Sequence, residues 1–301
     1  MSANESFEHL SAIQLAEWAL REDRASLDKT TEQLDLFLKL KNQKNEFNQS
    51  FIVSAKAEGV FSGIEWISAI SKVSGLDMST RWREGEIFTP GSVIVNGRGP
   101  WQKILQVERS LINLLQALCG TASVTSLFVK KVKKRWKDEL GLSEEKMPKI
   151  YHTRKTLPLL RDLQVKAVLA GGGFEHRKNL EERVLFKENH KFILLGQNQK
   201  FSDLVKFVVS YHPEAQFEVE NIEEARMASE AGARHLLLDN FTPEKVELAG
   251  RELNPTGVFL EVSGSLNLEN ISQFVCPGIS RLSVGALTHS VRAIDMSLDW
   301  I

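Results

Sequence analysis

The stretch AQFEVENIEEARMASEAGARHLLLDN, residues Ala215–Asn240, holds two short β-rich runs with a helix-compatible segment between them. Strand alternating with helix is typical of a parallel sheet whose strands are joined by helical crossovers. Four more β-rich runs in the same half of the chain follow this rhythm. They are Lys149–Thr153, Arg183–Asn189, Val258–Gly264 and Arg281–Leu287. Six such strands favour an α/β barrel, or an incomplete one, over an open doubly wound sheet. Periodicity alone leaves the closure of the barrel open.

Polar or glycine residues follow each apolar run at its carboxyl end. In parallel β/α barrels these ends meet at one mouth, where active sites are built. One polar end alone would indicate only a loop, but six converging ends predict a pocket. The groups at these ends are Arg154 and Lys155; Lys187, Glu188, Asn189 and His190; Glu218 and Glu220; Asp239 and Asn240; Ser263, Gly264 and Ser265; and Gly285 and His289.

The predicted pocket combines cations with carboxylates. Arginine presents a planar fork that suits carboxylate and phosphate oxygens, whereas lysine acts as a point charge. Two carboxylates near an oligophosphate suit Mg²⁺, which binds few protein ligands together with substrate phosphates. The cations are Arg154, Lys155, His176, Arg177 and Lys187, and the carboxylates are Glu220 and Asp239. This pattern predicts a site for a strongly anionic ligand, with Mg²⁺ held by the two carboxylates directly or through water.

Two small-residue turns follow late strands of the predicted sheet. The turn Ser263–Ser265 and the turn at Gly285 place backbone N–H groups near the beginning of a helix, which favours phosphate binding. The run Gly171–Gly173 has a plainer interpretation. It follows a helix predicted from Pro158 to Ala170, and proline commonly opens a helix that glycine closes.

The first third of the chain has a different pattern. Residues 7–48 are helical in spacing, and residues 51–70 begin as a strand and continue as a helix after Gly59 and Gly63. Turn residues between positions 85 and 100 separate short strands, which indicates a small antiparallel sheet. We therefore expect an α+β sandwich domain over residues 1–115. A long helix is expected over Val107–Trp136, with an interruption at Gly120.

The overall composition narrows the class of protein. The chain has 301 residues and a net charge of −1, so it has no global attraction to nucleic acid or anionic lipid. The basic run Lys130–Lys137 is more typical of a solvated helix face than of a nucleic-acid site. Cys119 and Cys276 stand far apart, which argues against a disulfide framework or a zinc site. The N-terminus is polar and no apolar run approaches the roughly 18 residues of a membrane span, so we expect a cytoplasmic protein.

Several motifs together resemble the quinolinate phosphoribosyltransferase family. The similarity runs from about residue 20 to the C-terminus, without large gaps. The motifs are VERSLINLLQALCGTAS (107–123), HTRKTLPLLRDLQVKAVLAGGGFEHRKNL (152–180), LFKENH (185–190), EVEN (218–221), AGARHLLLDNF (231–241), LEVSGSLN (260–267) and LSVGALTHSVRAIDMSLD (282–299).

The resemblance implies a fold, an assembly and a reaction. The fold is an N-terminal α+β sandwich domain, residues 1–115, and a C-terminal incomplete α/β barrel, residues 116–301, of the type II phosphoribosyltransferases. Residues 287–301 are able to pack back on the N-terminal domain. The assembly is a homodimer or a multiple of it. The reaction converts quinolinate and phosphoribosyl pyrophosphate to nicotinate mononucleotide, pyrophosphate and CO₂ with Mg²⁺.

The resemblance also implies roles for individual residues. The catalytic residues would be Lys155, Lys187, Glu220 and Asp239. The quinolinate carboxylates would be held by Arg154, Lys155, His176 and Arg177, with Arg109 reaching in from the partner subunit. Lys187 would lie near the phosphoribosyl group, and Glu220 and Asp239 on the ribose and Mg²⁺ side. The 5′-phosphate would lie against Ser263, Gly264, Ser265, Gly285 and His289.

The sequence departs from the family pattern at a few positions. His152 stands where the family usually has Asp, Glu175 where it has Asn, and Ser265 where it has Gly. Glu175 brings a negative charge beside the predicted carboxylate pocket. Ser265 bears on how closely a backbone approaches the phosphate. None of these departures removes a cation or carboxylate of the predicted site.

Three other functions stay open from the sequence. The first is a phosphoribosyltransferase for another pyridine or aromatic acid, which would share the phosphate side; the presence of both Arg154 and Arg177 favours a diacid instead. The second is a Schiff-base β/α-barrel lyase with Lys187 as nucleophile, which requires a neutral lysine amine. The third is a non-catalytic phosphate-binding protein, which Glu220 and Asp239 argue against.

Overall fold

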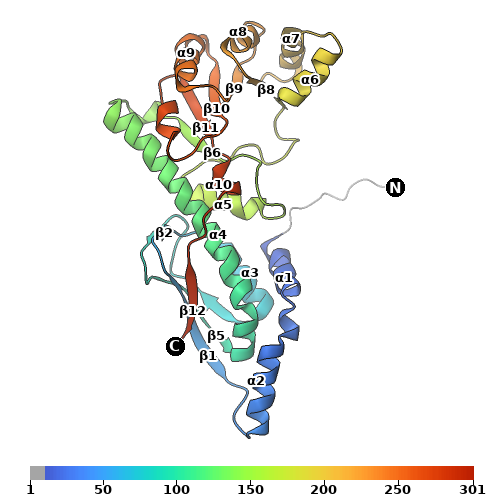
Figure 1. Ribbon diagram of the computed structural model, residues 1–301, viewed down its shortest axis with the longest axis vertical. Helices are drawn as coiled ribbons and strands as arrows, with labels where there is room; N and C mark the ends of the chain where they lie inside the picture. Colours follow the sequence, from blue (N-terminus) through green and yellow to red (C-terminus); the bar gives the residue numbers. More distant parts are fainter. Residues whose placement is uncertain (1–10) are drawn as a thin grey trace. The chain divides into compact units, whose positions relative to one another are not determined.

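The computed structural model describes residues 11–301, which divide into two compact units (Figure 1). Unit 1 holds the described residues up to Val124, together with Leu157–Gly171 and Val291–Ile301; unit 2 holds Thr125–Thr156 and Gly172–Ser290. The polar N-terminus and residues 7–10 of the predicted helical region lie outside the described residues. The predicted boundary between residues 115 and 116 falls inside one long helix, α4 (Trp101–Lys133).

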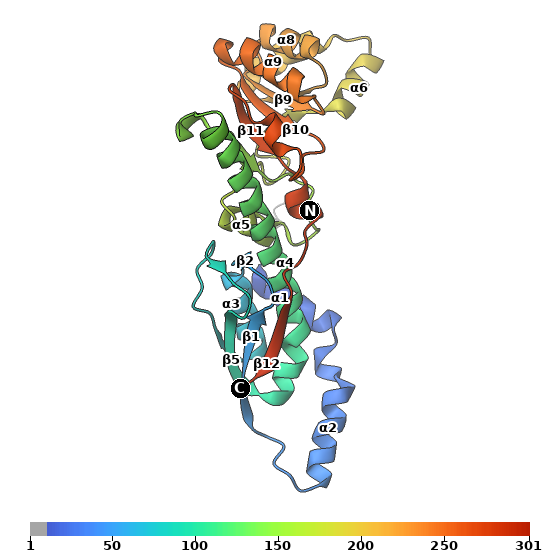
Figure 2. The same cartoon turned by 60° about the vertical axis from the view of Figure 1, so that its left-hand side comes forward.

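Unit 1 is built on an antiparallel sheet with strand order β12-β1-β5-β3, beside a two-stranded sheet of β2 and β4. The last strand of the chain pairs with β1, with Trp300 opposite Phe51, so the C-terminus completes this sheet (Figure 2). The strands are β1 (Asn48–Ala55), β2 (Gly59–Val60), β3 (Asp77–Ser79), β4 (Ile87–Phe88), β5 (Val93–Pro100) and β12 (Met296–Trp300). The helices are α1 (Ala12–Glu22), α2 (Lys29–Leu40), α3 (Ile64–Ser74), α5 (Arg161–Ala170) and the first part of α4, and a 3-10 turn spans Ala25–Leu27.

Local sequence explains where the first helices begin. The Ser11 hydroxyl accepts the Gln14 N–H at the start of α1, and the Gln14 side chain accepts the Ser11 N–H in return. Asp28 caps α2 by accepting the N–H groups of Thr30 and Thr31. The core between helices and sheet contains fully buried large side chains, each worth about 1.5–3 kcal/mol on burial. Among them are Phe51, Phe61, Trp66, Phe88, Ile94, Leu111 and Leu115.

Helix α4 differs from its sequence expectations in two respects. It runs through Gly120 without interruption. A Cβ at that position would lie 2.4 Å from the carbonyl oxygen of Arg292. The glycine therefore allows a close approach of the C-terminal segment. With its π-helical extension the helix spans Trp101–Glu139, which is long and apolar enough by composition to cross a membrane. In its most apolar window, 50% is buried inside the protein. Core helices of soluble proteins meet the same criteria of length and composition.

Unit 2 is built on a parallel six-stranded sheet with the order β6-β11-β10-β9-β8-β7, which confirms the predicted α/β architecture. No pairing joins the two edge strands β6 and β7 within residues 11–301, so the barrel is incomplete. The strands are β6 (Lys149–Tyr151), β7 (Leu185–Phe186), β8 (Gln216–Val219), β9 (His235–Asp239), β10 (Phe259–Ser263) and β11 (Ile279–Ser283). The helices are α6 (Glu188–Gly196), α7 (Phe201–Tyr211), α8 (Ile222–Glu230), α9 (Pro243–Leu253) and α10 (Ala286–His289), with 3-10 turns at Glu144–Lys146, Asn254–Thr256 and Ile271–Phe274.

The glycine run ends α5 as the sequence predicts. The helix ends at Ala170 with Gly171 as its C-cap, and Gly172 has a φ of 84°, which glycine adopts without strain. The beginning of this helix differs from the prediction. It lies at Arg161 rather than Pro158, because Leu159 takes a positive φ of 67° in a turn before it.

Candidate active site

A cavity of about 570 Å³ lies at the carboxyl ends of the strands of unit 2. It collects residues from β6 through β11, as the rule for parallel barrels predicts. Nine of the sequence-predicted residues line it: Arg154, Lys155, His176, Arg177, Lys187, Asp239, Ser263, Gly264 and Ser265. The other lining residues are Thr153, Leu185, Glu188, Asn189, Glu218, Leu237, Asn240, Glu261 and Ser283.

Lys187 and Glu218 form an ion pair inside the cavity. The Lys187 Nζ lies 3.1 Å from Glu218 Oε2, and the other carboxylate oxygen accepts the backbone N–H of Glu188 at 3.1 Å. Lys187 is the N-cap residue of α6, so the beginning of that helix fixes both partners. Glu218 stands at a predicted strand end, and the sequence predicted no role for it.

Glu220 does not line this cavity. It lies one residue beyond the end of β8, and its carboxylate is 3.4 Å from the ammonium of Lys191, which also pairs with Glu224 at 2.9 Å. Its side chain is half exposed. The acidic residues that do line the cavity are Glu188, Glu218, Asp239 and Glu261.

Asp239 stands at the end of β9 in an environment that disfavours its charge. Burial raises the pKa of the Asp239 carboxyl, and the negative charge of Glu218 raises the pKa further, against the opposing effects of Lys187 and Lys155. The side-chain amide of Asn240 donates to Asp239 Oδ2 at 2.9 Å. A cation placed beside this carboxylate would relieve its repulsion from Glu218.

Two arginines, Arg154 and Arg177, bring positive charge to the cavity. Arg177 Nη1 donates to the carbonyl oxygen of Arg183 at 2.9 Å. The pKa of Arg177 is lowered, first by burial and then by the like charges of Arg154 and Arg183. The buried Nε of Arg154 has no hydrogen-bond acceptor within residues 11–301. Such a donor is ready to receive an anionic ligand, since buried polar groups in proteins are nearly always paired.

His176 contacts a buried carboxylate that the sequence gave no reason to include. Its Nε2 lies 3.1 Å from Glu261 Oε1, which also accepts the hydroxyl of Ser283 at 2.6 Å. Burial would raise the pKa of the Glu261 carboxyl, but the hydrogen bonds from His176, Ser283 and Gln216 hold it below its usual range. Glu261 is therefore an anion in the folded protein at neutral pH.

The loop after β10 approaches its neighbours very closely. Gly264 has a φ of 98°, and a Cβ there would lie 2.2 Å from Asn240 Oδ1 and 2.8 Å from Asn240 N. Ser265 follows with a φ of 51°, a left-handed conformation that costs an L-residue about 1–2 kcal/mol. The loop therefore exposes backbone to the cavity at a position where only glycine fits, followed by a strained serine.

Gly285 and His289 are not among the residues that line the cavity. A Cβ at Gly285 would lie 2.9 Å from His289 Nε2 and 3.4 Å from Lys155 Cδ. Gly285 therefore lies close to His289 and to Lys155, which lines the cavity. The hydroxyl of Thr288 holds the same segment by donating to the carbonyl oxygen of Lys155 at 2.8 Å.

Arg109, predicted to bind quinolinate, and Glu175, a departure from the family pattern, are not among the residues that line the cavity. Arg109 belongs to unit 1, where it lies on α4 with its side chain exposed, 3.4 Å from Glu108. Glu175 forms an ion pair with Lys178 at 3.5 Å, which offsets the negative charge that it brings beside the cationic cluster.

The donor set allows a test of the expected metal. Within residues 11–301 no group of three or more His, Cys, Asp or Glu side chains is arranged to hold a metal ion. Mg²⁺ commonly binds through only one or two carboxylates together with waters and substrate phosphates. Asp239, with Glu218 on the neighbouring strand, fits that mode, because burial and then the negative charge of Glu218 raise the pKa of Asp239, and a cation would offset both effects.

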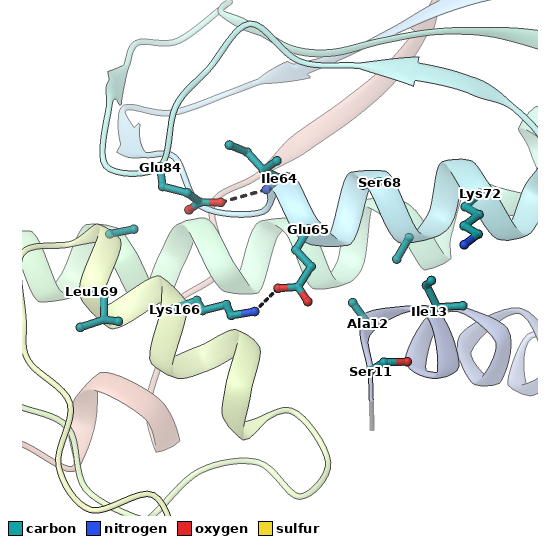
Figure 3. A pocket seen from close by; sticks show the side chains of 12 residues that line it. Ser11, Ala12, Ile13, Ile64, Glu65, Ser68, Lys72, Glu84, Lys166 and Leu169 are labelled. Atoms are coloured by element: carbon teal, nitrogen blue, oxygen red, sulfur yellow. Dashed lines mark hydrogen bonds and ion pairs between the residues drawn. The ribbon is translucent and has the colours of Figure 1, made fainter. Parts of the chain in front are cut away.

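A second cavity, of about 850 Å³, lies in unit 1 and has a different character (Figure 3). Glu65 and Lys166 form an ion pair across it, and Glu84 accepts the N–H groups of Gly63 and Ile64 at the beginning of α3. Glu65, Lys166 and Glu84 are thus engaged in contacts that hold the helices of unit 1. It contains none of the predicted site residues.

The fold and the site together define a class of protein. A parallel α/β barrel gathers two arginines, two lysines and several carboxylates at the carboxyl ends of its strands, in a chain that also carries an α+β unit. This is an α/β-barrel enzyme for strongly anionic substrates. Family comparison makes the class specific: the family model "Quinolinate phosphoribosyl transferase, N-terminal domain" matches residues 28–133, and the C-terminal domain model matches residues 122–299. The chain belongs to the quinolinate phosphoribosyltransferase family.

Individual relatives agree with this assignment. The chain is 36% identical over 255 residues to a probable nicotinate-nucleotide pyrophosphorylase (carboxylating) of Methanocaldococcus jannaschii, covering 82% of this chain and 85% of that one. It is 31% identical over 247 residues to the human nicotinate-nucleotide pyrophosphorylase (carboxylating), covering 81% and 80%. The crystal structure of the Ehrlichia chaffeensis nicotinate-nucleotide pyrophosphorylase superposes with a TM-score of 0.81 at 26% identity, over 96% of this chain and 98% of that chain.

Proposed function

We propose that the cavity of unit 2 binds quinolinate together with phosphoribosyl pyrophosphate and joins them. Family membership makes the chain a transferase of NAD biosynthesis, a carboxylating nicotinate-nucleotide pyrophosphorylase that forms nicotinate mononucleotide, pyrophosphate and CO₂. The observation that best supports this location is the buried Nε of Arg154, which has no acceptor in the part of the chain that the structure describes and belongs to a cavity shared with Lys155, Arg177 and Lys187. Both substrates carry the anionic oxygens that such donors bind.

The two ends of the cavity favour different substrates. We assign the quinolinate carboxylates to Arg154, Lys155 and Arg177, with His176 beside them. The phosphoribosyl group is assigned to the side of Lys187 and Asp239, and its 5′-phosphate to the loop Ser263–Ser265. Planar arginine forks suit the carboxylates of a flat diacid, whereas a lysine point charge and the backbone N–H groups of a small-residue loop suit phosphate.

The chemistry requires positioning and charge stabilisation. The pyridine nitrogen donates its lone pair to C1 of the ribose, while the bond from C1 to the pyrophosphate oxygen breaks and pyrophosphate leaves with the electron pair. The bond to the ring-2 carboxylate then breaks and CO₂ departs. The adjacent positive nitrogen stabilises the electron pair left at that ring carbon, which takes up a proton. The chain holds the two substrates in line and balances their charge, so no covalent enzyme intermediate is needed.

We assign Mg²⁺ to Asp239 and Glu218, in place of the pair Glu220 and Asp239 expected from the sequence. The ion would neutralise charge on the departing pyrophosphate. Asp239 would also face the positive charge that develops on the ribose as the bond to pyrophosphate weakens. Glu220 is the less suited ligand, because its carboxylate is engaged with Lys191 outside the cavity.

We also propose a cytoplasmic homodimer, or a multiple of it, in which Arg109 completes the partner's cavity. The exposed position of Arg109 supports this, since its only recorded ion-pair partner in the described residues is the neighbouring Glu108. Complementation tests it. Arg109→Ala and Arg177→Ala should each be nearly inactive alone, and a mixture that exchanges subunits should regain activity, because one site of each hybrid dimer is intact. A mixture without recovered activity would contradict the shared site.

A pyrophosphate-release assay tests the main proposal. Release should require quinolinate, phosphoribosyl pyrophosphate and Mg²⁺ together, and it should be accompanied by an equal amount of CO₂. Omitting any one component is the control. Nicotinate is the decisive competitor because it lacks the ring-2 carboxylate. Turnover of nicotinate as fast as that of quinolinate would show a phosphoribosyltransferase for a different pyridine acid.

A further inference from the structure

The contacts of His176 fix its protonation state. Its Nδ1 lies 2.8 Å from the backbone N of Arg177, and a backbone amide only donates, so Nδ1 must accept and carries no proton. Its Nε2 lies 3.1 Å from Glu261 Oε1, and a carboxylate only accepts, so Nε2 carries the proton. His176 is therefore a neutral imidazole of the Nε2–H tautomer.

A second histidine holds the same segment from the other side. The backbone N–H of His176 donates to His152 Nε2 at 3.2 Å, and His152 Nδ1 lies 2.9 Å from the carbonyl oxygen of Thr153, so its proton is on Nδ1. Two neutral rings thus accept two successive backbone N–H groups, those of His176 and Arg177. Because both rings are buried, each amide would lose its only recorded acceptor if its ring turned away.

Glu261 sets this arrangement from beneath the cavity. Its side chain is almost fully buried on β10, the central part of the sheet. One oxygen accepts from His176 and Ser283, and the other accepts from the Gln216 amide at 2.9 Å, with Arg281 at 3.8 Å. A buried carboxylate with this many donors is a rigid anchor rather than an acid or base that exchanges protons with a substrate.

We propose that Glu261 is a positioning residue for quinolinate: it fixes the tautomer and orientation of His176, which in turn fixes the backbone from which Arg177 extends into the cavity. The proposal rests on the assignment of Arg177 to the quinolinate carboxylates. Glu261 itself need not touch the substrate. Supporting residues that orient a binding group commonly change affinity by about 10- to 100-fold when they are removed.

A graded substitution series separates anchoring from charge. Glu261→Gln keeps an oxygen for His176 and Ser283. In the wild type, Gln216 Oε1 has no hydrogen-bond partner within residues 11–301. The new amide can donate to this atom once the Gln216 side-chain amide flips. Glu261→Met keeps the length and removes every acceptor. We expect quinolinate binding, measured by calorimetry, to weaken less than about threefold in Glu261→Gln and more than tenfold in Glu261→Met, with phosphoribosyl pyrophosphate binding changed less than threefold in both.

The chain offers a matched control and a second route. Glu214 and His235 form a carboxylate–imidazole pair at 2.7 Å away from the cavity, with Glu214 exposed, so Glu214→Gln should leave quinolinate binding unchanged. If Glu261→Met does not fold, Gln216→Met removes one donor to Glu261 from a residue that does not line the cavity. It should produce a smaller loss that is again confined to quinolinate.

Nitrogen NMR of the histidine rings gives a readout that is independent of turnover. Without substrate, His176 should show protonated Nε2 and unprotonated Nδ1 in the wild type and in Glu261→Gln, and a tautomer mixture in Glu261→Met. An unchanged His176 tautomer in Glu261→Met, or equal losses for both substrates, would overturn the proposal. If the wild-type protein does not bind quinolinate, the proposed function is wrong instead. The NMR comparison then still tests whether Glu261 fixes the tautomer of His176.

Discussion

The ammonium of Lys187 lies 3.1 Å from the carboxylate of Glu218, whose side chain is only 7% exposed. The same carboxylate also accepts the backbone N–H of Glu188. An ion pair with a largely buried carboxylate favours the charged lysine, because removing the proton would leave the carboxylate without its counter-ion. This contact decides between two chemistries for Lys187: it suits a residue that binds phosphate and opposes one that attacks a carbonyl.

Borohydride trapping tests that distinction. A Schiff-base enzyme needs a neutral lysine amine to add to a carbonyl compound. Because the Glu218 carboxylate engages the Lys187 Nζ, we expect no covalent adduct at this residue when the protein is incubated with carbonyl substrates and reduced. Intact-protein mass spectrometry makes the measurement, and Lys187→Met provides the background. An adduct mapped to Lys187 in the wild type and absent from the variant would favour the lyase interpretation.

Removal of the Arg177 side chain should separate the two substrates. A hydrogen bond to a charged group contributes about 1.5–3 kcal/mol, and about 1.4 kcal/mol is tenfold in affinity. Arg177→Ala should therefore weaken quinolinate binding at least tenfold and leave phosphoribosyl pyrophosphate binding nearly unchanged, as measured by calorimetry. Lys178→Ala, the neighbouring exposed cation, is the control for a loss of positive charge alone. Equal losses for both substrates would refute the division of the cavity.

Asp239 should show a conflict between stability and activity. Because the pKa of its carboxyl is raised in the folded protein, its stability contribution is complete below the unfolded value of 3.8 and is lost as the pH rises through the folded pKa. At neutral pH the ionised Asp239 carboxylate lowers the free energy of unfolding until a cation binds. Asp239→Asn should therefore raise the urea midpoint at pH 7.5 and lower turnover by orders of magnitude. Asp203→Asn, on exposed α7, should change neither markedly. A fall in the urea midpoint of Asp239→Asn would count against this account.

The protein should lose stability in acid through Glu261. Its folded pKa lies below the ordinary value of 4.5, so its contribution is fully present above pH 4.5 and is lost as the pH falls through the folded pKa. Glu261→Gln has no proton to take up and should flatten this part of the curve of unfolding free energy against pH. Denaturant titrations between pH 5 and 2.5 provide the comparison. Parallel curves for the wild type and the variant would show that other carboxylates dominate.

The sequence predicted the parts of the site that follow from strand order. Lys187 and Asp239 are found because each directly follows an apolar run, and carboxyl ends of parallel strands meet. The choice between Glu218 and Glu220 was not predictable in this way. Residues two apart on a strand share a face, and only the end of β8 at Val219 decides that the first lies in the cavity and the second outside it.

The hydrogen bonds that join His152, His176 and Glu261 could not be predicted from the sequence either. His176 and Glu261 are 85 residues apart and meet only through the order of the strands, so no local pattern pairs them. His152 was noted only as a departure from the family pattern. The structure gives it a part, since its ring accepts the His176 N–H where a carboxylate oxygen would do the same. Long-range polar pairs of this kind depend on packing, which periodicity does not encode.

Ser265 allows a final test, of the loop Ser263–Ser265 to which we assign the 5′-phosphate. Its φ of 51° is costly for serine and free of strain for glycine, although glycine loses more conformational entropy on folding. We expect Ser265→Gly to raise the free energy of unfolding by up to about 1 kcal/mol, as measured in urea. Ser263→Gly, at the end of β10 in the same loop, is the control and should be destabilising, because glycine weakens a strand. If Ser265→Gly destabilises the protein as well, contacts of the serine side chain outweigh its backbone strain. Phosphoribosyl pyrophosphate binding should then also weaken, because the hydroxyl rather than the backbone would be holding the loop in place.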